Sequence, residues 1–381
     1  MPGHAGTGGR DVIFAWEQCK LSDISEKSYE KNTDNKYSTV FTNSAEHGIV
    51  KQRDFFDKDI ANSSNISGYY VVRKNYFVYN PRISNQAKFG PINRNKLDES
   101  GIMSPLYLVF TVHDIDESFL ETLFQTTTWH RFMYQNGDTG ARADRFAIKD
   151  STFMSMPIKV PSLEEQHKLA LAFQKLDQTI TLHEEKKHQL ERLKSALLQK
   201  MFADKSGYPD IRFEGFSDEW EQCKLGDVAK INSGKDYKGL QPGKIPVYGT
   251  GGYMLSVNDK LSDIDAIGIG RKGTIDKPYY LNAPFWTVDT LFYVTPRGTV
   301  DISFMFPLFK NINWKRYDES TGVPSLSKNT IKKIRVSFPQ NNEQVKIGDL
   351  FQKITQIITL HDQKLNLLKL VKQSLLQNMF I

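Results

Sequence analysis

The most constraining feature of this 381-residue chain is an internal duplication. The hexapeptide Trp-Glu-Gln-Cys-Lys-Leu begins at Trp16 and again at Trp220, 204 residues later. Residues 161–202 align with residues 339–380 at an offset of 178, and 20 of these 42 aligned pairs are identical. The inserts between these matched segments share little sequence beyond a Thr-Gly pair, and the first insert is 26 residues longer. Two similar frames therefore carry two dissimilar inserts.

The duplicated tails are predicted to be helices of about 40 residues, roughly 60 Å long. Each tail follows a proline, Pro161 or Pro339, and has acidic or Asn residues in its first turn. Apolar residues then recur at steps of four and three, which is the spacing of a coiled-coil seam. Two ordinary amphipathic helices, each lying on its own domain, are the alternative, but helices of this length favour pairing of the two copies. The seam positions that we expect at the packing and subunit interface are Phe173, Leu176, Ile180, Leu190 and Leu197, with Phe351, Ile354, Ile358, Leu368 and Leu375 in the second copy.

The histidines and cysteines predict neither a metal site nor a disulfide. His183 and His361 occupy the same seam position in the two copies, where a polar residue that sets helix register is a better explanation than a metal ligand. Cys19 and Cys223 are copies of one position, so we interpret them as partly buried, unreactive thiols.

The inserts, about 25–157 and 229–335, are predicted to be mixed α/β regions with short strands. In the first, residues 69–72 and 76–79 flank a turn at 73–75, which is a hairpin pattern. In the second, Gly and Pro separate three strand-like segments, residues 266–269, 275–281 and 291–294.

The predicted fold class is α+β, with two mixed α/β domains separated by two long helices. The helices are expected to form an antiparallel coiled coil, which gives the chain a pseudo-two-fold internal repeat. The expected boundaries are 1–157 and 203–335 for the two mixed domains, 158–202 for the central helix and 336–381 for the C-terminal helix.

Composition narrows the class of protein without identifying it. The net charge of +6 is too small to establish nucleic-acid binding by itself. The apolar runs are too short to cross a bilayer, and no basic-then-apolar signal segment begins the sequence. We therefore expect a cytoplasmic protein with no membrane partner.

Motifs for cofactors and catalysis are weak or missing. Gly268–Gly273 matches G-x-G-x-x-G, but Pro278 follows within five residues and no helix start separates them, which disfavours a dinucleotide site. Residues 282–285, Asn-Ala-Pro-Phe, resemble the Asn-Pro-Pro-Phe motif of adenine methyltransferases, but Ala replaces the first Pro and no cofactor-type glycine motif precedes them. Because the sequence also has no Walker A motif, we assign no catalytic residue and no metal ligand.

Basic residues interleaved with aromatic residues and glycines are the main indication of nucleic-acid binding, and they occur in both inserts. A glycine-rich turn would let Arg271 and Lys272 approach phosphates or guanine edges closely. The candidate DNA-binding residues are Arg82, Lys88, Arg94, Arg142 and Arg145 in the first insert, and Lys235, Lys238, Tyr248, Tyr253, Arg271, Lys272 and Lys328 in the second.

In combination, these segments resemble the specificity subunits of type I restriction–modification systems. Residues 208–227 are similar to the opening of such a subunit, and Pro161 with Glu165 and Gln166 resembles the Pro-x-x-x-Glu-Gln helix of that family, which the second copy repeats. The sequences Tyr-Asn-Pro-Arg, ending at Arg82, and Ile-Gly-Arg-Lys-Gly, ending at Gly273, resemble motifs of target-recognition domains. The resemblance covers about residues 16–381, because residues 1–15 do not match the segment before Trp220.

The resemblance implies a division of labour among subunits. Each insert would be a target-recognition domain that reads one half of a split double-stranded DNA sequence. The helices would set the unread spacer and dock two methyltransferase subunits. S-adenosylmethionine would be bound by those partners, and ATP and Mg²⁺ by separate restriction (translocase) subunits, with no cofactor bound by this chain. A fused DNA methyltransferase and a coiled-coil scaffold without DNA reading are the alternatives.

Overall fold

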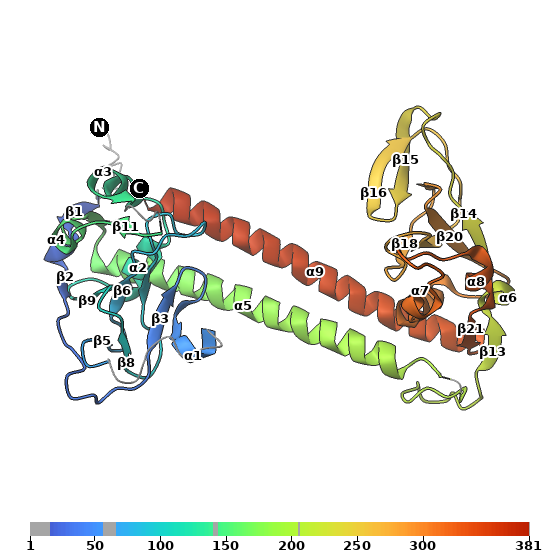
Figure 1. The fold of residues 1–381 in the computed structure, drawn as a ribbon, viewed down its shortest axis with the longest axis horizontal. Helices are drawn as coiled ribbons and strands as arrows, with labels where there is room; N and C mark the ends of the chain where they lie inside the picture. Colours follow the sequence, from blue (N-terminus) through green and yellow to red (C-terminus); the bar gives the residue numbers. More distant parts are fainter. Residues whose placement is uncertain (1–15, 56–65, 140–143, 205, 381) are drawn as a thin grey trace, which may run out of the picture. The chain divides into compact units, whose positions relative to one another are not determined.

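The computed structural model describes residues 16–55, 66–139, 144–204 and 206–380 (Figure 1). The chain divides into two compact units, Met1–Thr181 with Asn366–Ile381, and Leu182–Leu365. Each unit contains one insert together with a part of each long helix. None of the described helices is both long enough and apolar enough to span a membrane.

The first unit is built on a four-stranded antiparallel sheet with the order β2-β9-β6-β7. The described residues of this unit also form the two-stranded sheets β1-β12, β3-β4, β5-β8 and β10-β11. The elements are β1 Glu17–Lys20, the 3₁₀ helix η1 Leu21–Asp23, β2 Ser25–Lys27, β3 Phe41–Ser44, β4 Gly48–Lys51, α1 Gln52–Phe55, β5 Tyr70–Val72, β6 Phe77–Tyr79, β7 Ile92–Arg94, β8 Gly101–Met103, β9 Leu108–Val112, α2 Glu117–Phe124, α3 His130–Asn136, β10 Asp138–Thr139, β11 Phe146–Ala147, α4 Asp150–Met154 and β12 Pro157–Val160.

The second unit is built on a four-stranded sheet with the order β14-β20-β17-β18, accompanied by a three-stranded sheet β16-β15-β19 and the pair β13-β21. Figure 1 shows the β15–β16 hairpin projecting from the rest of this unit. The elements are β13 Glu221–Lys224, α6 Leu225–Val228, β14 Ala229–Ser233, β15 Pro242–Gly249, β16 Gly252–Val257, β17 Ala266–Gly270, β18 Tyr279–Leu281, β19 Trp286–Thr287, β20 Leu291–Pro296, α7 Ile302–Asn311, the 3₁₀ helix η3 Trp314–Tyr317, α8 Lys328–Lys333 and β21 Arg335–Phe338.

The two four-stranded sheets share one strand order although their sequences differ. In each, the strand that begins the insert (β2 or β14) lies at the edge beside the strand that ends the sheet in sequence (β9 or β20). The flanking strand pairs also match, since Cys19 lies opposite Ile158 and Cys223 lies opposite Val336 at equivalent positions. The duplication therefore extends into the inserts, where the sequence hardly shows it.

The expected hairpin at residues 69–79 is wrong, although both of its strands exist. Strand β5 pairs with β8, whereas β6 pairs with β7 and β9, so the two strands belong to different sheets. The turn between them is held from outside: the Asn75 N–H donates to the Asn95 carbonyl (2.8 Å), and the Asn95 N–H donates to the Tyr76 carbonyl (2.8 Å). A three-residue connection suits a corner between sheets as well as a hairpin, and the local pattern does not distinguish them.

The strands expected in the second insert are found, with one difference. Residues 266–269 and 291–294 lie in β17 and β20, as predicted. Of residues 275–281, only Tyr279–Leu281 form a strand, β18. The preceding residues form a turn in which the Ile275 N–H donates to the Gly273 carbonyl (3.0 Å), so their backbone is not extended along a neighbouring strand.

The two long helices are α5, Leu163–Lys200, and α9, Asn341–Met379, with 38 and 39 residues. Within the first unit, Asp177 of α5 forms an ion pair with Lys372 of α9 (2.7 Å). Within the second unit, Lys187 of α5 pairs with Asp362 of α9 (2.7 Å), and the Nδ1 atoms of His183 and His361 lie 2.9 Å apart. Ascending positions on one helix meet descending positions on the other, so the predicted antiparallel pairing is confirmed.

A buried glutamine joins each long helix to the insert of its unit. The Gln166 side-chain amide donates to the Pro161 carbonyl (2.8 Å), and its oxygen accepts the Asp116 N–H (3.0 Å). The Asp116 carboxylate in turn accepts the N–H groups of Ser118 and Phe119 and so caps α2. The start of α2 is thereby fixed to the start of α5.

The same joint is repeated in the second unit. The Gln344 amide donates to the Pro339 carbonyl (2.9 Å) and accepts the Asp301 N–H (3.0 Å), and the Asp301 carboxylate caps α7. Further along, the indole N–H of Trp314 donates to the Phe309 carbonyl (2.8 Å), as that of Trp129 donates to the Phe124 carbonyl (3.2 Å). Asp116 and Asp301, like the two tryptophans, are 185 residues apart, an offset that the sequence analysis missed.

Each unit's core is completed by the end of a tail helix from the other copy of the repeat. In the first unit, the Phe380 ring lies 5.8 Å from Trp16, 5.5 Å from Phe119 and 5.8 Å from Phe173. In the second unit, Phe202 stands at the same place among the equivalent aromatic rings, at 6.4, 5.5 and 5.8 Å. Residues near the C-terminus therefore belong to the core of the N-terminal domain.

Candidate functional site

Three loops of the second unit meet at the glycine-rich turn that follows β17. The Thr274 hydroxyl donates to the Thr250 carbonyl (3.0 Å) in the turn of the β15–β16 hairpin. On the other side, the Gly273 N–H donates to the Pro324 carbonyl (2.8 Å) and the Leu326 N–H donates to the Arg271 carbonyl (3.0 Å). We call this surface, made by residues 249–252, 271–274 and 318–327, the three-loop surface.

Glycine is required in the turn itself. Gly273 has φ of +81°, in the left-handed region, and a Cβ on Gly270 would lie 2.6 Å from the Thr274 carbonyl oxygen. The chain then continues to strand β18 and not to a helix, so the N-terminal helix amides that a dinucleotide site needs are not formed there.

Arg271 and Lys272 are exposed on the three-loop surface, and among the described residues neither side chain has a hydrogen-bond or ion-pair partner. Asp318 of the third loop forms no ion pair with either of them within the described part of the chain, and its Oδ1 accepts the backbone N–H groups of Ser325 (2.8 Å) and Ser320 (3.0 Å). These hydrogen bonds hold the pKa of Asp318 below its usual value. The two cations therefore present free donors to solvent.

The other five predicted residues of the second insert lie on, beside or near this surface. Tyr248 and Tyr253 face each other across the hairpin, with ring centroids 6.4 Å apart, and Tyr253 is 63% exposed. Lys328 is the first residue of α8, directly after the third loop. Lys235 is tied by its backbone to Thr287 (2.9 Å) of β19, the strand beside β15. Lys238, three residues further on, is also exposed.

In the first unit, the loop after β6 packs against the segment that contains β11. The Phe146 N–H donates to the Pro81 carbonyl (2.8 Å), and Arg82 and Arg145 lie opposite each other in an isolated bridge. Lys88 is exposed on the same loop, and together with burial it lowers the pKa of His130 on α3. Arg82, Lys88 and Arg145 are thus brought to one corner of the unit. Arg142 lies outside the described residues.

Helix α3 adds two residues to this corner that the sequence analysis missed. Arg131 is exposed and Tyr134 is 79% exposed, and the neighbouring His130 ring lies 5.0 Å from Phe89 of the loop. The alternation of aromatic and basic residues from Trp129 to Tyr134 is the pattern that could have identified them.

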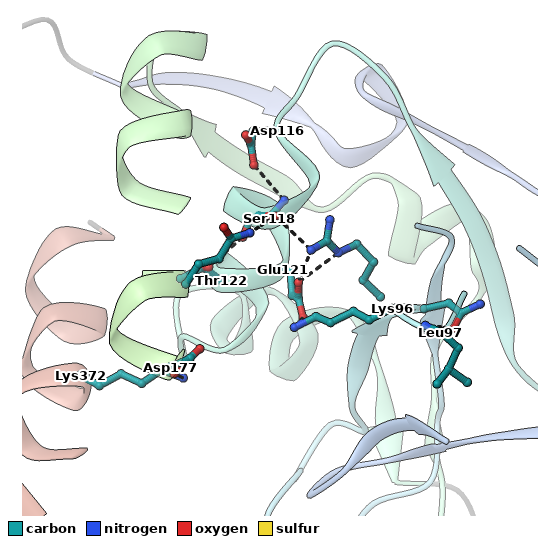
Figure 2. Close-up of polar contacts among 11 residues, drawn as sticks. Lys96, Leu97, Asp116, Ser118, Glu121, Thr122, Asp177 and Lys372 are labelled. Carbon is teal, nitrogen blue, oxygen red and sulfur yellow. Dashed lines mark hydrogen bonds and ion pairs between the residues drawn. The ribbon is translucent and has the colours of Figure 1, made fainter. Parts of the chain in front are cut away.

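Arg94 is placed differently from the other candidates. Its guanidinium donates to the Glu121 carboxylate (3.1 Å) and to the Ser118 hydroxyl (3.0 Å), and its side chain is only 11% exposed. Lys96 binds the other oxygen of Glu121 (2.5 Å), as Figure 2 shows. Because its donors are already used inside the domain, we leave Arg94 out of the contact set proposed below.

The ten predicted seam residues are all buried or half-buried. Phe173, Ile180, Phe351 and Ile354 are buried, and the other six are half-buried. Exposed apolar side chains instead lie elsewhere on the same helices. The pairs separated by 178 residues are Leu182 with Leu360 (54% and 61% exposed) and Leu193 with Val371 (48% and 41% exposed).

Both cysteine thiols have raised pKa values. Cys19 and Cys223 are both partly buried and free. Burial raises the pKa of Cys223 to about 11 and raises that of Cys19 as well, and nearby Asp side chains add to both shifts. Among the described residues, no three His, Cys, Asp or Glu side chains are grouped closely enough to hold a metal ion.

Comparison with known proteins identifies a family that matches this chain. The sequence matches the type I restriction modification DNA specificity domain over residues 15–192 and again over residues 217–370. A type I restriction enzyme specificity subunit (MjaIX) of Methanocaldococcus jannaschii is 26% identical over 177 residues, which are 44% of this chain. The match spans about a third, 35%, of that curated relative's length.

Two solved structures have a similar fold across nearly the whole chain. The S subunit of a type I restriction–modification system from M. genitalium gives a TM-score of 0.65 at 17% identity, covering 98% of both chains. An HsdS subunit from Thermoanaerobacter tengcongensis gives 0.51 at 14% identity, also covering 98% of both. With a family match over well over half of its residues, in two copies, the chain belongs to the family of type I restriction–modification specificity subunits.

Proposed function

We propose that this protein is the DNA-reading subunit of a type I restriction–modification complex, in which each insert contacts one half of a bipartite duplex target. The observation that carries the proposal is the pairing of a duplicated frame with two different loop clusters. Each cluster displays exposed cations, Arg271 and Lys272 in one unit and Arg82 and Lys88 in the other. Since the clusters differ, the two half-sites should differ too.

The chemistry of the three-loop surface suits duplex DNA. An arginine can donate two hydrogen bonds to guanine O6 and N7 in the major groove, and a lysine can neutralise a phosphate. Tyr253, exposed on the hairpin, adds an apolar face with a hydroxyl beside these cations. The proposed contacts are Lys235, Lys238, Tyr248, Tyr253, Arg271, Lys272 and Lys328 in the second insert and Arg82, Lys88, Arg131, Tyr134, Arg142 and Arg145 in the first.

The test replaces Arg271 by Ala and measures binding of the assembled complex to its target and to single-base variants. If the guanidinium reads a base, affinity should fall by about 1–3 kcal/mol and preference should relax at one position. Lys260→Ala is the matched control, because Lys260 follows the opposite end of the hairpin and is paired with Asp263 (2.6 Å). Unchanged binding by Arg271→Ala and by Lys272→Ala would remove the three-loop surface as the DNA contact.

We further propose that the exposed apolar side chains on the long helices dock two methyltransferase subunits. Leu182 and Leu360 are equivalent by the repeat and are both mostly exposed, an arrangement suited to two identical partners. Leu182→Glu should reduce capture of the methyltransferase subunit while changing the stability of this chain by less than about 0.5 kcal/mol. Leu163→Glu, an exposed leucine without a repeated counterpart, is the control. Equal capture by all three proteins would exclude this surface.

We propose that the methyltransferase and restriction subunits, and not this chain, carry out the catalysis. S-adenosylmethionine would be bound by the methyltransferase subunits, and ATP and Mg²⁺ by restriction subunits that act as translocases, so the purified chain should transfer no methyl group. Transfer of labelled methyl groups from S-adenosylmethionine to DNA by this chain alone would support the alternative of a fused methyltransferase.

A further inference from the structure

The second unit contains an open pocket of about 900 Å³ whose lining includes none of the proposed DNA contacts. Its walls come from the C-terminal half of α5, the N-terminal half of α9, helix α7 and strand β18. Tyr280 and Phe306 form an aromatic wall, with ring centroids 5.6 Å apart. Lys194 and Lys310 line the same cavity. Its volume lies in the range of pockets that hold small organic ligands.

The two lysines in this cavity have no carboxylate partner among the described residues. Lys194 Nζ donates to the Thr355 hydroxyl (2.7 Å), and Lys310 Nζ lies 5.4 Å from the centre of the Phe306 ring. The lining carboxylate, Asp265, is already used, because it accepts the Tyr280 hydroxyl (2.8 Å) and the Ala283 N–H (2.8 Å).

Burial and mutual repulsion both disfavour the charged forms of Lys194 and Lys310. Burial lowers the pKa of both Lys194 and Lys310, and the charge of Lys194 lowers that of Lys310 further. Two neighbouring ammonium groups that repel each other are stabilised when an anion lies between them.

At the equivalent place in the first unit, the charge of the lysine is neutralised by a carboxylate. Lys372 is the repeat equivalent of Lys194, and Asp177 is the equivalent of Thr355, each pair being 178 residues apart. There the two side chains form an ion pair of 2.7 Å (Figure 2). Lys310 is replaced by Gln125 at the offset of 185. One copy of the repeat thus neutralises its lysine, whereas the other copy leaves it uncompensated and adds a second.

Other polar side chains near the Asp177–Lys372 ion pair are also hydrogen-bonded or ion-paired. Gln174 of α5 donates to the Ser118 hydroxyl of α2 (2.9 Å), and Glu121 is held by Arg94 and Lys96. The equivalents of Glu121 and Ser118 in the second unit are Phe306 and Ser303, which line the cavity. The substitution of apolar for charged groups at this place leaves the second unit with an open pocket that has an aromatic wall and two cations.

We propose that this pocket binds a small organic phosphate, such as a nucleotide, with the phosphate held between Lys194 and Lys310 and the apolar part against Tyr280 and Phe306. Lysine is a point-charge donor suited to phosphate, and a flat ring stacks on an aromatic wall. The two lysines and the two aromatic rings line one pocket of a single unit, and this combination suits a phosphate joined to a flat ring better than it suits the acidic side chains of a partner protein.

The test titrates the full-length chain with AMP, inorganic phosphate and adenosine by isothermal calorimetry. AMP should bind, inorganic phosphate should bind more weakly, and adenosine should not bind. Thr355→Asp, which recreates the arrangement of the first unit, should weaken AMP binding at least tenfold, as should Lys310→Gln. Because Thr355 is exposed, its variant should fold, which far-UV circular dichroism checks. Lys372→Gln, in the first unit, is the control and should bind AMP normally.

Three results would overturn the proposal. One is no binding of AMP or inorganic phosphate at millimolar concentration and low salt. Another is undiminished AMP binding by Thr355→Asp, which would assign the binding to surface lysines elsewhere. The third is loss of methyltransferase-subunit capture by Thr355→Asp without any phosphate binding by the unaltered chain, which would make the pocket a protein docking site.

Discussion

A buried carboxylate anchors the second unit where its long helix begins. Glu343 is 1% exposed and accepts two hydrogen bonds from Arg212, Nε to Oε1 and Nη2 to Oε2, both of 2.7 Å. The equivalent residue of the first unit, Glu165, is exposed and accepts the indole N–H of Trp16 (3.2 Å). Trp220, the counterpart of Trp16, has a buried indole N–H without a hydrogen-bond partner among the described residues.

Arg212→Ala should destabilise the second unit by about 3–5 kcal/mol, because it leaves a buried charge unpaired. Chemical denaturation followed by hydrogen exchange would locate this loss among residues 221–338. Adding Glu343→Gln to Arg212→Ala should recover part of the stability, since the uncompensated charge is removed. Glu165→Gln is the control and should change stability by less than about 0.5 kcal/mol. Equal effects of Arg212→Ala and Glu165→Gln would contradict this account.

The partly buried thiol of Cys223 gives a pH-dependent prediction. Since burial raises its pKa to about 11, only about one molecule in a thousand carries the reactive thiolate at pH 8. In a Cys19→Ser background, alkylation of the folded protein by iodoacetamide should be much slower than that of the unfolded chain. The rate should rise about tenfold for each pH unit below 11. Alkylation at the unfolded rate at pH 8 would show that the thiol is not held in this environment.

At the scale of elements, the end of α9 is a structural part of the first unit. Phe380 is 3% exposed among Trp16, Phe119 and Phe173, and Leu375 and Leu376 pack on the same core. Removal of the chain from Leu375 onward would expose these aromatic rings. Truncating a buried Phe side chain alone costs about 3–5 kcal/mol.

We therefore expect that deletion from Leu375 to the C-terminus destabilises residues 16–160, at the opposite end of the sequence. Hydrogen exchange should show lost protection in β2, β6 and β9 and unchanged protection in β14, β17 and β20. Phe202→Ala is the matched variant and should give the reverse pattern, because Phe202 fills the equivalent place in the second core. Loss spread evenly over both units would contradict the assignment.

The long helices were the elements that the sequence predicted best. Both contain a long periodic run of apolar residues after a proline, and neither has a proline within it, so local and tertiary preferences agree. The hairpin expected around Arg73 failed because the partner of a short strand is chosen by distant residues: β5 lies against β8, about 30 residues away in sequence. The shared strand order of the two inserts could not be read at all, since few residue identities carry it.

The candidate site was predicted unevenly for related reasons. The exposure of Arg271 and Lys272 could be predicted because glycines mark a turn, where side chains point to solvent. Arg94 was chosen on its charge alone. The charge does not reveal that Glu121, 27 residues further along the chain, binds its guanidinium. Arg131 and Tyr134 were missed because their exposure depends on how α3 packs on Phe89.

At the scale of the whole molecule, two copies of one frame carry two inserts with different loops. The frame elements repeat in detail, from the Cys19 and Cys223 strands to the Gln166 and Gln344 joints. The inserts retain a sheet order and differ in their loops. Each insert has its own core, so exchange of one insert should leave the other folded and functional.

The most direct test of DNA reading by two independent inserts is a methylation map of host genomic DNA. The map should show one bipartite motif when the complex contains the unaltered chain. Replacement of residues 229–335 by the corresponding insert of another specificity subunit should change one half of the motif and leave the other half intact. A change in both halves, or an unchanged motif, would contradict the account.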